Sequence, residues 1–251
     1  MSGAATSDAP GTAMIATLCA RGDLKVWSLL VTLFGDAAMA PGAMLSGPQL
    51  SEILGLLKIR PEAQRVALHR LRKEGWITAT RQGRIGLYGL SAEGREETAA
   101  VAAQVYAPAA AQAAARHLLV LPDGQTAPDQ GLCLGEGRFL SPVPGGKDSL
   151  SAPLPGPLPQ WVADAALPAP LLAELQDLSE ALDMDPVAPE STTDAAALRL
   201  LILHQWRRLV LRLPPEAEAL LGPDWVGARC RARVATHLAT LPRLEAIKPG
   251  P

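Results

Sequence analysis

The sequence predicts a mostly helical protein with a small amount of β structure: a winged helix-turn-helix near the N-terminus, a proline-rich middle region and a helical C-terminal region. The first observation is the order of patterns in residues 46–90, where an apolar helix, a tight turn, a basic helix and a ribbon with a basic tip follow one another. The second is charge, because residues 58–84 hold eight basic and two acidic side chains, a net +6, in a chain of net charge −2. A basic patch on a mildly acidic chain is typical of a surface that binds phosphate.

Length and composition set the class of protein. A chain of 251 residues with 48% hydrophobic and 19% charged residues is typical of one to three globular domains. Three scattered cysteines, Cys19, Cys133 and Cys230, form neither a disulfide framework nor a zinc pattern. The N-terminus lacks the pattern of a secretory signal, and no apolar run approaches the ~20 residues that cross a bilayer. We expect a soluble, cytoplasmic protein without a metal or cofactor.

Changes in pattern along the chain divide it into four parts. We expect a disordered tail at 1–22, a DNA-binding winged helix-turn-helix domain at 23–106, a small proline-rich middle domain at 107–190 and a helical domain at 191–251. Eight prolines among residues 140–170 exclude a long helix there and make a central strand unfavourable. Trp161 and the apolar residues around it indicate a packed irregular segment.

Two helices are predicted before the basic one. Residues 24–39 are apolar on more than one side, which is typical of a buried supporting helix. Ser46 and Gln49 then have the spacing of a capping box, and Pro48 suits a first turn. Apolar residues at spacings of three and four give this second helix a core face, made of Leu50, Ile53, Leu54 and Leu57.

The basic helix is predicted at 61–74, with Pro61 at its start and Gly75 as its stop. Its periodicity places Ala63, Ala67 and Leu71 toward the core, with Val66 beside them. The opposite face carries Arg65, His69, Arg72 and Lys73. The helix therefore has one side for the core and one for a polyanion.

A hairpin and further helices complete the prediction. Residues 76–80 and 85–90 have the composition of strands, and Gly83 in the intervening turn can adopt a positive φ. Ser91 caps a helix that reaches about Tyr106. Short strands are expected at 117–121 and 131–135, and helices at 169–183, 194–213 and 226–241. The helix at 194–213 is apolar nearly all round, so it is either a central helix or an interface.

Residues 61–94, PEAQRVALHRLRKEGWITATRQGRIGLYGLSAEG, resemble the PaaX-like family of repressors of phenylacetic acid degradation operons. The blocks SLLVTLFGDA at 28–37 and LILHQWRRLVLRLPPEAEALLGPDWVGARCRA at 201–232 are similar to the opening and closing parts of that family. The resemblance implies a homodimeric transcriptional repressor of a catabolic operon. It also implies a middle domain of ferredoxin-like α/β topology, reduced here, and release from DNA by an acyl-CoA such as phenylacetyl-CoA.

The DNA contacts are predicted on the basic helix and the ribbon. Arg65, His69 and Arg72 are candidates for base edges in the major groove, where arginine binds guanine through two hydrogen bonds. Side chains at the helix ends and the ribbon tip are candidates for phosphate contacts, which position a protein without reading sequence. The full predicted set is Arg60, Gln64, Arg65, His69, Arg72, Lys73, Arg81 and Arg84. The alternative for any one of these residues is a solvated surface position.

The remaining motifs favour structural roles. Arg207, Arg208 and Arg212 are candidates to hold a CoA phosphate, although ion pairs between the C-terminal helices, with Asp224 nearby, are the favoured explanation. Trp76 is expected to pack under the ribbon rather than to stack on a base. No nucleophile motif, phosphate loop or metal-ligand spacing is complete, so the sequence predicts no enzyme. The alternative function is a winged helix used for protein or RNA contacts without operator binding.

Overall fold

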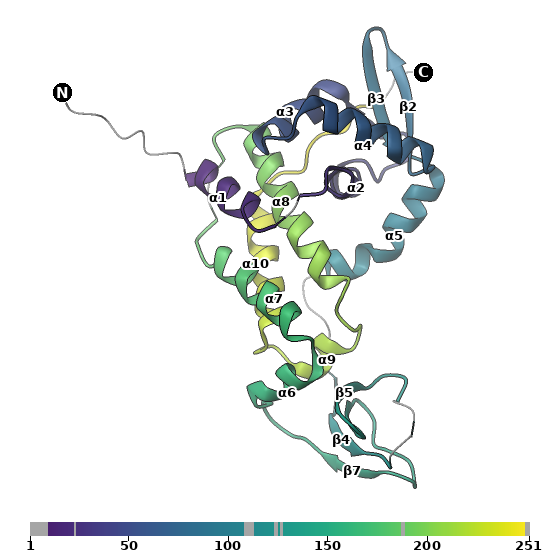
Figure 1. Cartoon of the computed structure of the whole chain (residues 1–251), viewed down its shortest axis with the longest axis vertical. Helices are drawn as coiled ribbons and strands as arrows, with labels where there is room; N and C mark the ends of the chain where they lie inside the picture. The colour runs from purple at the N-terminus through teal and green to yellow at the C-terminus, as the bar shows by residue number, and fades with distance from the viewer. Residues whose placement is uncertain are drawn as a thin grey trace, which may run out of the picture. The chain divides into compact units, whose positions relative to one another are not determined.

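The computed structural model describes residues 10–22, 24–107, 113–122, 125, 128–186 and 189–248 (Figure 1). About half of the chain is helical, with two small antiparallel sheets, so the predicted mixture of helix and limited β structure is confirmed. The chain forms two compact units. Unit 1 comprises Met1–Val105, Met184–Arg207 and Thr236–Pro251, and unit 2 comprises Tyr106–Asp183 and Arg208–Ala235.

The N-terminal segment differs from the disordered tail expected at 1–22. Pro10–Cys19 form helix α1, in which Met14, Ile15 and Leu18 are buried. These three residues have the spacing of one helix face, and burying that face offsets the conformational entropy lost on ordering the segment. The prediction was wrong for α1 because its few large apolar residues stand among many small ones, and such a sequence shows only a weak apolar face. Residues 1–9 lie outside the described part of the chain.

Unit 1 is built around helix α2 (Val26–Ala37), in which every residue from Ser28 to Asp36 is buried. Helices α3 (Gly47–Leu56) and α4 (Pro61–Lys73) follow; α4 lies beside α2, and α3 lies against α4 (Figure 1). The predicted capping box of α3 is confirmed, since the Ser46 hydroxyl accepts from the Gln49 backbone N–H. The four apolar residues predicted for its core face are all buried.

The turn between α3 and α4 has an unusual residue at its centre. Lys58 adopts φ 56°, the left-handed region in which glycine is normally found. Its N–H donates to the Gly55 carbonyl at 2.9 Å, and the Ile59 N–H donates to the Leu54 carbonyl at 3.0 Å. These two bonds form a Schellman motif that closes α3. Pro61 begins α4 only two residues after Ile59, so the two helices are joined by a short connection that the Lys58 and Ile59 hydrogen bonds hold.

The predicted hairpin is present after α4. Gly75 ends the helix with φ 79°, and strands β2 (Ile77–Gln82) and β3 (Ile85–Leu90) pair antiparallel. Gln82 lies opposite Ile85, so the turn has two central residues, and Gly83 supplies the positive φ of 62°. Strand β1 (Leu45–Ser46) pairs with β3 and completes a sheet of order β1-β3-β2.

Helix α5 (Ala92–Tyr106) is fixed to the end of the hairpin. The Ser91 hydroxyl donates to the Gly75 carbonyl at 2.6 Å and accepts from the Gly94 N–H at 2.9 Å, which confirms Ser91 as the cap. A Cβ on Gly94 would lie 2.2 Å from the Trp76 carbonyl oxygen, so only glycine permits this approach. Trp76 is half-buried, and its packing under the ribbon stays a prediction.

A buried ion pair connects distant segments of unit 1. Arg199 on helix α8 (Thr192–Val210) binds both carboxylate oxygens of Asp36 on α2, at 2.6 and 2.9 Å, and both side chains are buried. Its remaining terminal nitrogen donates to the carbonyls of Leu238 and Leu241. Trp206 is fully buried and donates to the Val105 carbonyl at 3.0 Å. Helix α8 is therefore a central helix, one of the two roles expected for it.

Unit 2 contains a four-stranded antiparallel sheet of order β5-β6-β4-β7. The strands are β4 (His117–Val120), β5 (Leu132–Gly135), β6 (Arg138–Ser141) and β7 (Leu150–Pro153). Two of these strands were predicted, while β6 and β7 were not. Of these strands, the proline-rich stretch contributes the end of β6 and the edge strand β7, where a missing N–H is tolerated.

Helices complete unit 2. They are α6 (Gln160–Ala166), α7 (Ala169–Ala181), α9 (Ala217–Leu221) and most of α10 (Val226–Thr240). Arg231 on α10 forms a buried ion pair with Glu218 on α9 and donates to the Ala107 carbonyl. Trp161 was expected to be packed, yet it is 60% exposed, because it lies on the outer side of the short helix α6. Among the described residues, no helix is both long and apolar enough to span a bilayer.

Candidate nucleic-acid interface

Helix α4 presents a core face and an exposed face, but the core face is rotated relative to the prediction. The buried residues are Gln64, Ala67, Leu68 and Leu71. Ala63, predicted to be in the core, is exposed, and Val66 is 69% exposed. The core face is rotated because the Gln64 side chain lies in the interior. There its Oε1 accepts a hydrogen bond from the Ser51 hydroxyl of α3 at 3.1 Å. A sequence pattern weighted by hydrophobicity does not anticipate a buried glutamine.

The predicted DNA contacts are therefore placed unequally. Gln64 is 6% exposed and bonded to α3, so it is removed from the candidate set. The other seven side chains are exposed. On α4 itself, Arg65, His69 and Arg72 are spaced four and three residues apart, which places them in one stripe along the helix.

Two of the arginines on α4 are matched by acidic neighbours. Arg65 binds the Glu62 carboxylate at 2.9 Å, with both side chains largely exposed. Arg70 binds Glu74 at 2.8 Å, and its guanidinium lies 5.0 Å from the centre of the Trp27 ring on α2. Arg70 therefore holds α4 against α2, and an exposed pair such as Arg65–Glu62 contributes little to folding stability.

Six exposed cations around α4 and the hairpin have no carboxylate within ion-pair distance among the described residues. We call this set the basic surface: Lys58, Arg60, Arg72, Lys73, Arg81 and Arg84. Both acidic residues of the segment are already used by Arg65 and Arg70. The excess positive charge counted in the sequence is thus concentrated on side chains that are free to bind an anion.

The hairpin extends the basic surface beyond the helix. Figure 1 shows β2 and β3 projecting past α4. Arg81 lies near the end of β2, opposite Gly86, and Arg84 lies in the turn. Their exposed positions at the tip suit contacts with a phosphate backbone beside the groove that a helix occupies.

Val66 is the site feature that the sequence analysis missed. It lies on the exposed side of α4 between Glu62 and His69, at helical spacings of four and three residues. Its side chain is 69% exposed within a charged surface, so most of it is available for contact with another molecule. Apolar side chains on a recognition helix contact the methyl group of thymine.

Cys19 lies close enough to Lys58 for its thiol pKa to respond to that charge. Burial raises the pKa of its thiol, and the positive charge of Lys58 lowers it by a smaller amount. The thiol is therefore neutral at physiological pH, as expected for a structural cysteine rather than a nucleophile.

The three arginines proposed for a CoA phosphate have different positions. Arg207 lies in unit 1 and donates to the hydroxyls of Thr32 and Ser28 at 3.1 and 3.0 Å. Arg212 lies in unit 2 and pairs with Glu174 at 2.8 Å. Arg208 also belongs to unit 2. Because Arg207 and Arg212 are bound within the chain, we no longer assign a phosphate to this set, and Asp224 forms no ion pair with it among the described residues.

Comparison with known proteins gives consistent matches at both ends of the chain. A family model described as PaaX-like protein matches residues 25–94, and one described as PaaX-like protein C-terminal domain matches residues 169–244. The transcriptional repressor PaaX of Escherichia coli K12 is 28% identical over 242 residues, covering 81% of this chain and 76% of that protein. An uncharacterised protein of Mycobacterium tuberculosis, Rv0674, has a solved structure with 18% identity and a TM-score of 0.45, covering 84% of this chain and 93% of its own.

Proposed function

We propose that this chain, which belongs to the PaaX-like family, is a transcriptional repressor that binds an operator in double-stranded DNA. The observation that carries the proposal is the basic surface: six exposed cations on one helix, its preceding turn and a hairpin, none of which has an acidic partner within the described ranges. Duplex DNA carries a dense line of phosphates, and releasing its counterions drives binding to such a surface.

The element order supports a winged helix-turn-helix. Helix α2, strand β1, helices α3 and α4, and the β2–β3 hairpin follow one another, with β1 added to the hairpin sheet. In this architecture α4 is the recognition helix that enters the major groove, and the hairpin is the wing. The buried side of α4 and the bonded turn at Lys58 hold the helix against α2 and α3 while its other side stays exposed.

We assign two kinds of contact to the exposed residues. Arg65, His69 and Arg72 read base edges, and Val66 contacts a thymine methyl group. The other members of the basic surface bind phosphates: Lys58, Arg60, Lys73, Arg81 and Arg84. Glu62 holds Arg65 when DNA is absent, and that exposed pair is weak enough to open when a base offers two acceptors.

The proposal extends to the rest of the molecule. We propose that the chain acts in the cytoplasm as a homodimer on an inverted repeat and catalyses no reaction. We also propose that the sheet of unit 2 is a reduced ferredoxin-like sheet, since its order and antiparallel pairing suit that topology. We call the sheet reduced because the described residues of the β4–β5 and β6–β7 connections contain no helix. Release by an acyl-CoA stays a prediction without assigned residues.

The first test is selection of duplex sites from a random DNA pool, followed by measurement of affinity against salt. Five phosphate contacts from each subunit predict a slope of about −4.5 per subunit in log K against log salt, and about twice that for a dimer on an inverted repeat. A specific duplex with a steep slope supports the proposal. Equal or tighter binding to RNA, or a nearly flat slope, would favour the alternative role in RNA or protein contacts.

The second test separates sequence reading from general charge. The double variant Arg65→Ala/Arg72→Ala is expected to lose discrimination between the selected site and random duplex, by roughly 1–3 kcal/mol for each arginine that reads a base. Arg138→Ala, an exposed arginine on β6 of unit 2, is the matched control and is expected to bind normally. Full discrimination by the double variant would remove α4 from the reading role.

A further inference from the structure

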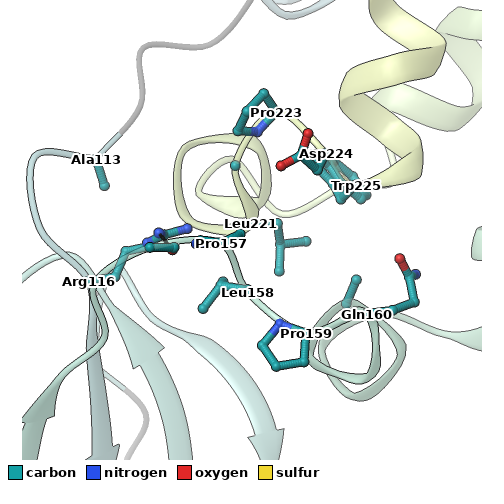
Figure 2. Close-up of a pocket in the computed structure, with 13 residues that line it drawn as sticks. Ala113, Arg116, Pro157, Leu158, Pro159, Gln160, Leu221, Pro223, Asp224 and Trp225 are labelled. Atoms are coloured by element: carbon teal, nitrogen blue, oxygen red, sulfur yellow. Dashed lines mark hydrogen bonds between the residues drawn. The ribbon is translucent and has the colours of Figure 1, made fainter.

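A pocket of about 450 Å³ lies within unit 2 (Figure 2). Three segments far apart in the sequence line it: residues 113–116 before β4, residues 156–163 leading into α6, and residues 221–225 after α9. Its lining is mixed: apolar atoms make up slightly more than half of the wall, and the lining residues include Leu158, Leu221, Trp225 and three prolines. This volume is typical of a site for a small organic molecule, and the mixed lining suits one with both apolar and polar groups.

The walls of the pocket are held in place before any ligand arrives. Arg116 donates to the Leu220 carbonyl at 3.4 Å and also to the Gly156 carbonyl, so it connects two of the three segments. The Trp225 ring packs over Gly227, where a Cβ would lie 2.2 Å from the indole. A preformed pocket loses little side-chain freedom when a ligand binds.

Trp225 supplies an unused donor. Its side chain is 3% exposed, and its indole N–H has no hydrogen-bond partner among the described residues. Leaving a buried donor without an acceptor is costly, and native interiors seldom do so. Because this nitrogen has almost no accessible surface, a small rotation of the ring would be needed to bring its N–H to a ligand oxygen in the pocket that Trp225 lines.

The charged groups of the pocket lie on two sides. Figure 2 shows Arg116 on one side, Asp224 and Trp225 on the other, and Leu158 and Leu221 between them. Arg116 is bound by backbone carbonyls and has no carboxylate partner among the described residues. Asp224 is exposed, and in the part of the chain that the structure describes its carboxylate forms no ion pair. The order across the pocket is therefore cation, apolar wall, then a donor beside an acceptor.

We propose that this pocket binds a small hydroxy-substituted aromatic or alicyclic carboxylate. The ligand carboxylate pairs with Arg116, and its ring packs against Leu158, Leu221 and the Trp225 indole. Its hydroxyl group accepts from the Trp225 N–H and donates to Asp224. Each polar group of the pocket then has a partner of the opposite kind. This inference concerns binding alone and does not rest on the DNA-binding proposal.

Calorimetric titration of the whole chain tests the proposal, with 4-hydroxybenzoate and 3-(4-hydroxyphenyl)propionate as probes. At least one probe is expected to bind saturably. The analogues 3-phenylpropionate and 3-(4-hydroxyphenyl)propionamide lack the hydroxyl or the charge, and each is expected to bind the pocket about tenfold or more weakly than 3-(4-hydroxyphenyl)propionate, or not at all. Equal binding of acid and amide, or no binding of either probe, overturns the proposal. Binding of a CoA thioester in place of the free acids also overturns it.

Variants locate the binding. Arg116→Gln is expected to weaken the probe about tenfold or more, because a charge-assisted bond is lost. Trp225→Phe keeps an aromatic ring but removes the indole N–H, and a loss of about three- to tenfold is expected. Trp161→Phe on the exposed side of α6 and Arg138→Gln on β6 are matched controls with unchanged affinity. Circular dichroism checks the fold of each variant, and full affinity in a folded Trp225→Phe protein would place the ligand elsewhere.

Discussion

Arginines in the interior and cations on the basic surface carry the same charge but have opposite surroundings. In the interior, Arg199 pairs with Asp36 in unit 1, and Arg231 pairs with Glu218 in unit 2. Each also donates to backbone carbonyls. On the basic surface, Arg72, Arg81 and Arg84 have no acidic partner among the residues that the structure describes.

This difference separates stability from binding. A buried charge must be matched, because removing its partner leaves an ion in a low-dielectric interior. An exposed charge is solvated and is worth little to the fold, so it can be kept unmatched for a phosphate. Changes in the interior should therefore alter unfolding, and changes on the basic surface should alter DNA affinity.

The largest effect is expected for Arg199→Met. Removing one member of the buried pair should lower the free energy of unfolding by about 3–5 kcal/mol, since Asp36 would stay charged and buried. Arg243, 3.4 Å from Asp36, offsets part of this loss. Denaturant titration measures the change, and the double variant Arg199→Met/Asp36→Leu is expected to recover much of it. A loss below about 1 kcal/mol for the single variant would contradict the assignment.

A smaller effect, a gain in DNA affinity, is expected for Glu62→Gln. The change frees Arg65 and removes a negative charge from the DNA-facing side, so affinity for duplex should rise by about three- to tenfold at low salt. Stability should fall by about 0.3–1 kcal/mol, because Glu62 lies in the first turn of α4. Glu96→Gln on α5, also exposed, is the matched control. Unchanged affinity would show that Arg65 does not contact DNA.

Val66 tests whether the exposed face of α4 reads bases by shape as well as charge. Val66→Ala should cost about 0.8 kcal/mol of affinity at one thymine and nothing measurable in stability. The measurement replaces each thymine of the selected site with deoxyuridine, which lacks the methyl group. The wild-type chain should lose affinity at one position, and the variant should not. Equal sensitivity of both chains would rule out the methyl contact.

The smallest effect is expected at the turn between the two helices. Lys58→Gly should raise the free energy of unfolding by about 0.5–1 kcal/mol, because glycine adopts the left-handed conformation without strain. Lys58→Ala removes the same charge but keeps the strain, so it should not be stabilising. Both variants should lose the same DNA affinity. A stability gain from Lys58→Ala would indicate repulsion between cations rather than backbone strain.

The sequence was most informative where structure is local. The caps at Ser46 and Ser91, the stop at Gly75 and the turn at Gly83 follow from bonds or φ values within a few residues, and the structure contains all of them. The same reasoning was less successful on α4, where the choice between Ala63 and Gln64 for the core depends on Ser51 of another helix.

Tertiary contacts decided which charged groups are available. Composition supplied the net positive segment at 58–84, but only the structure shows that Glu62 and Glu74 are used by Arg65 and Arg70. The partners of Arg207 and Arg212 likewise come from residues 38 or more positions away. Periodicity carries no information about such partners, because they depend on how separate elements pack.

By itself the sequence determined the order of the helices and the hairpin, the local caps and the family resemblance. These features depend on short-range bonds and on apolar spacing, both of which are written in neighbouring residues. The tertiary structure decided the helix α1, the rotation of α4, the buried pair Arg199–Asp36 and the pocket at Arg116 and Trp225. Each of these brings together residues from distant segments, and the energy that selects them exists only once those segments are packed.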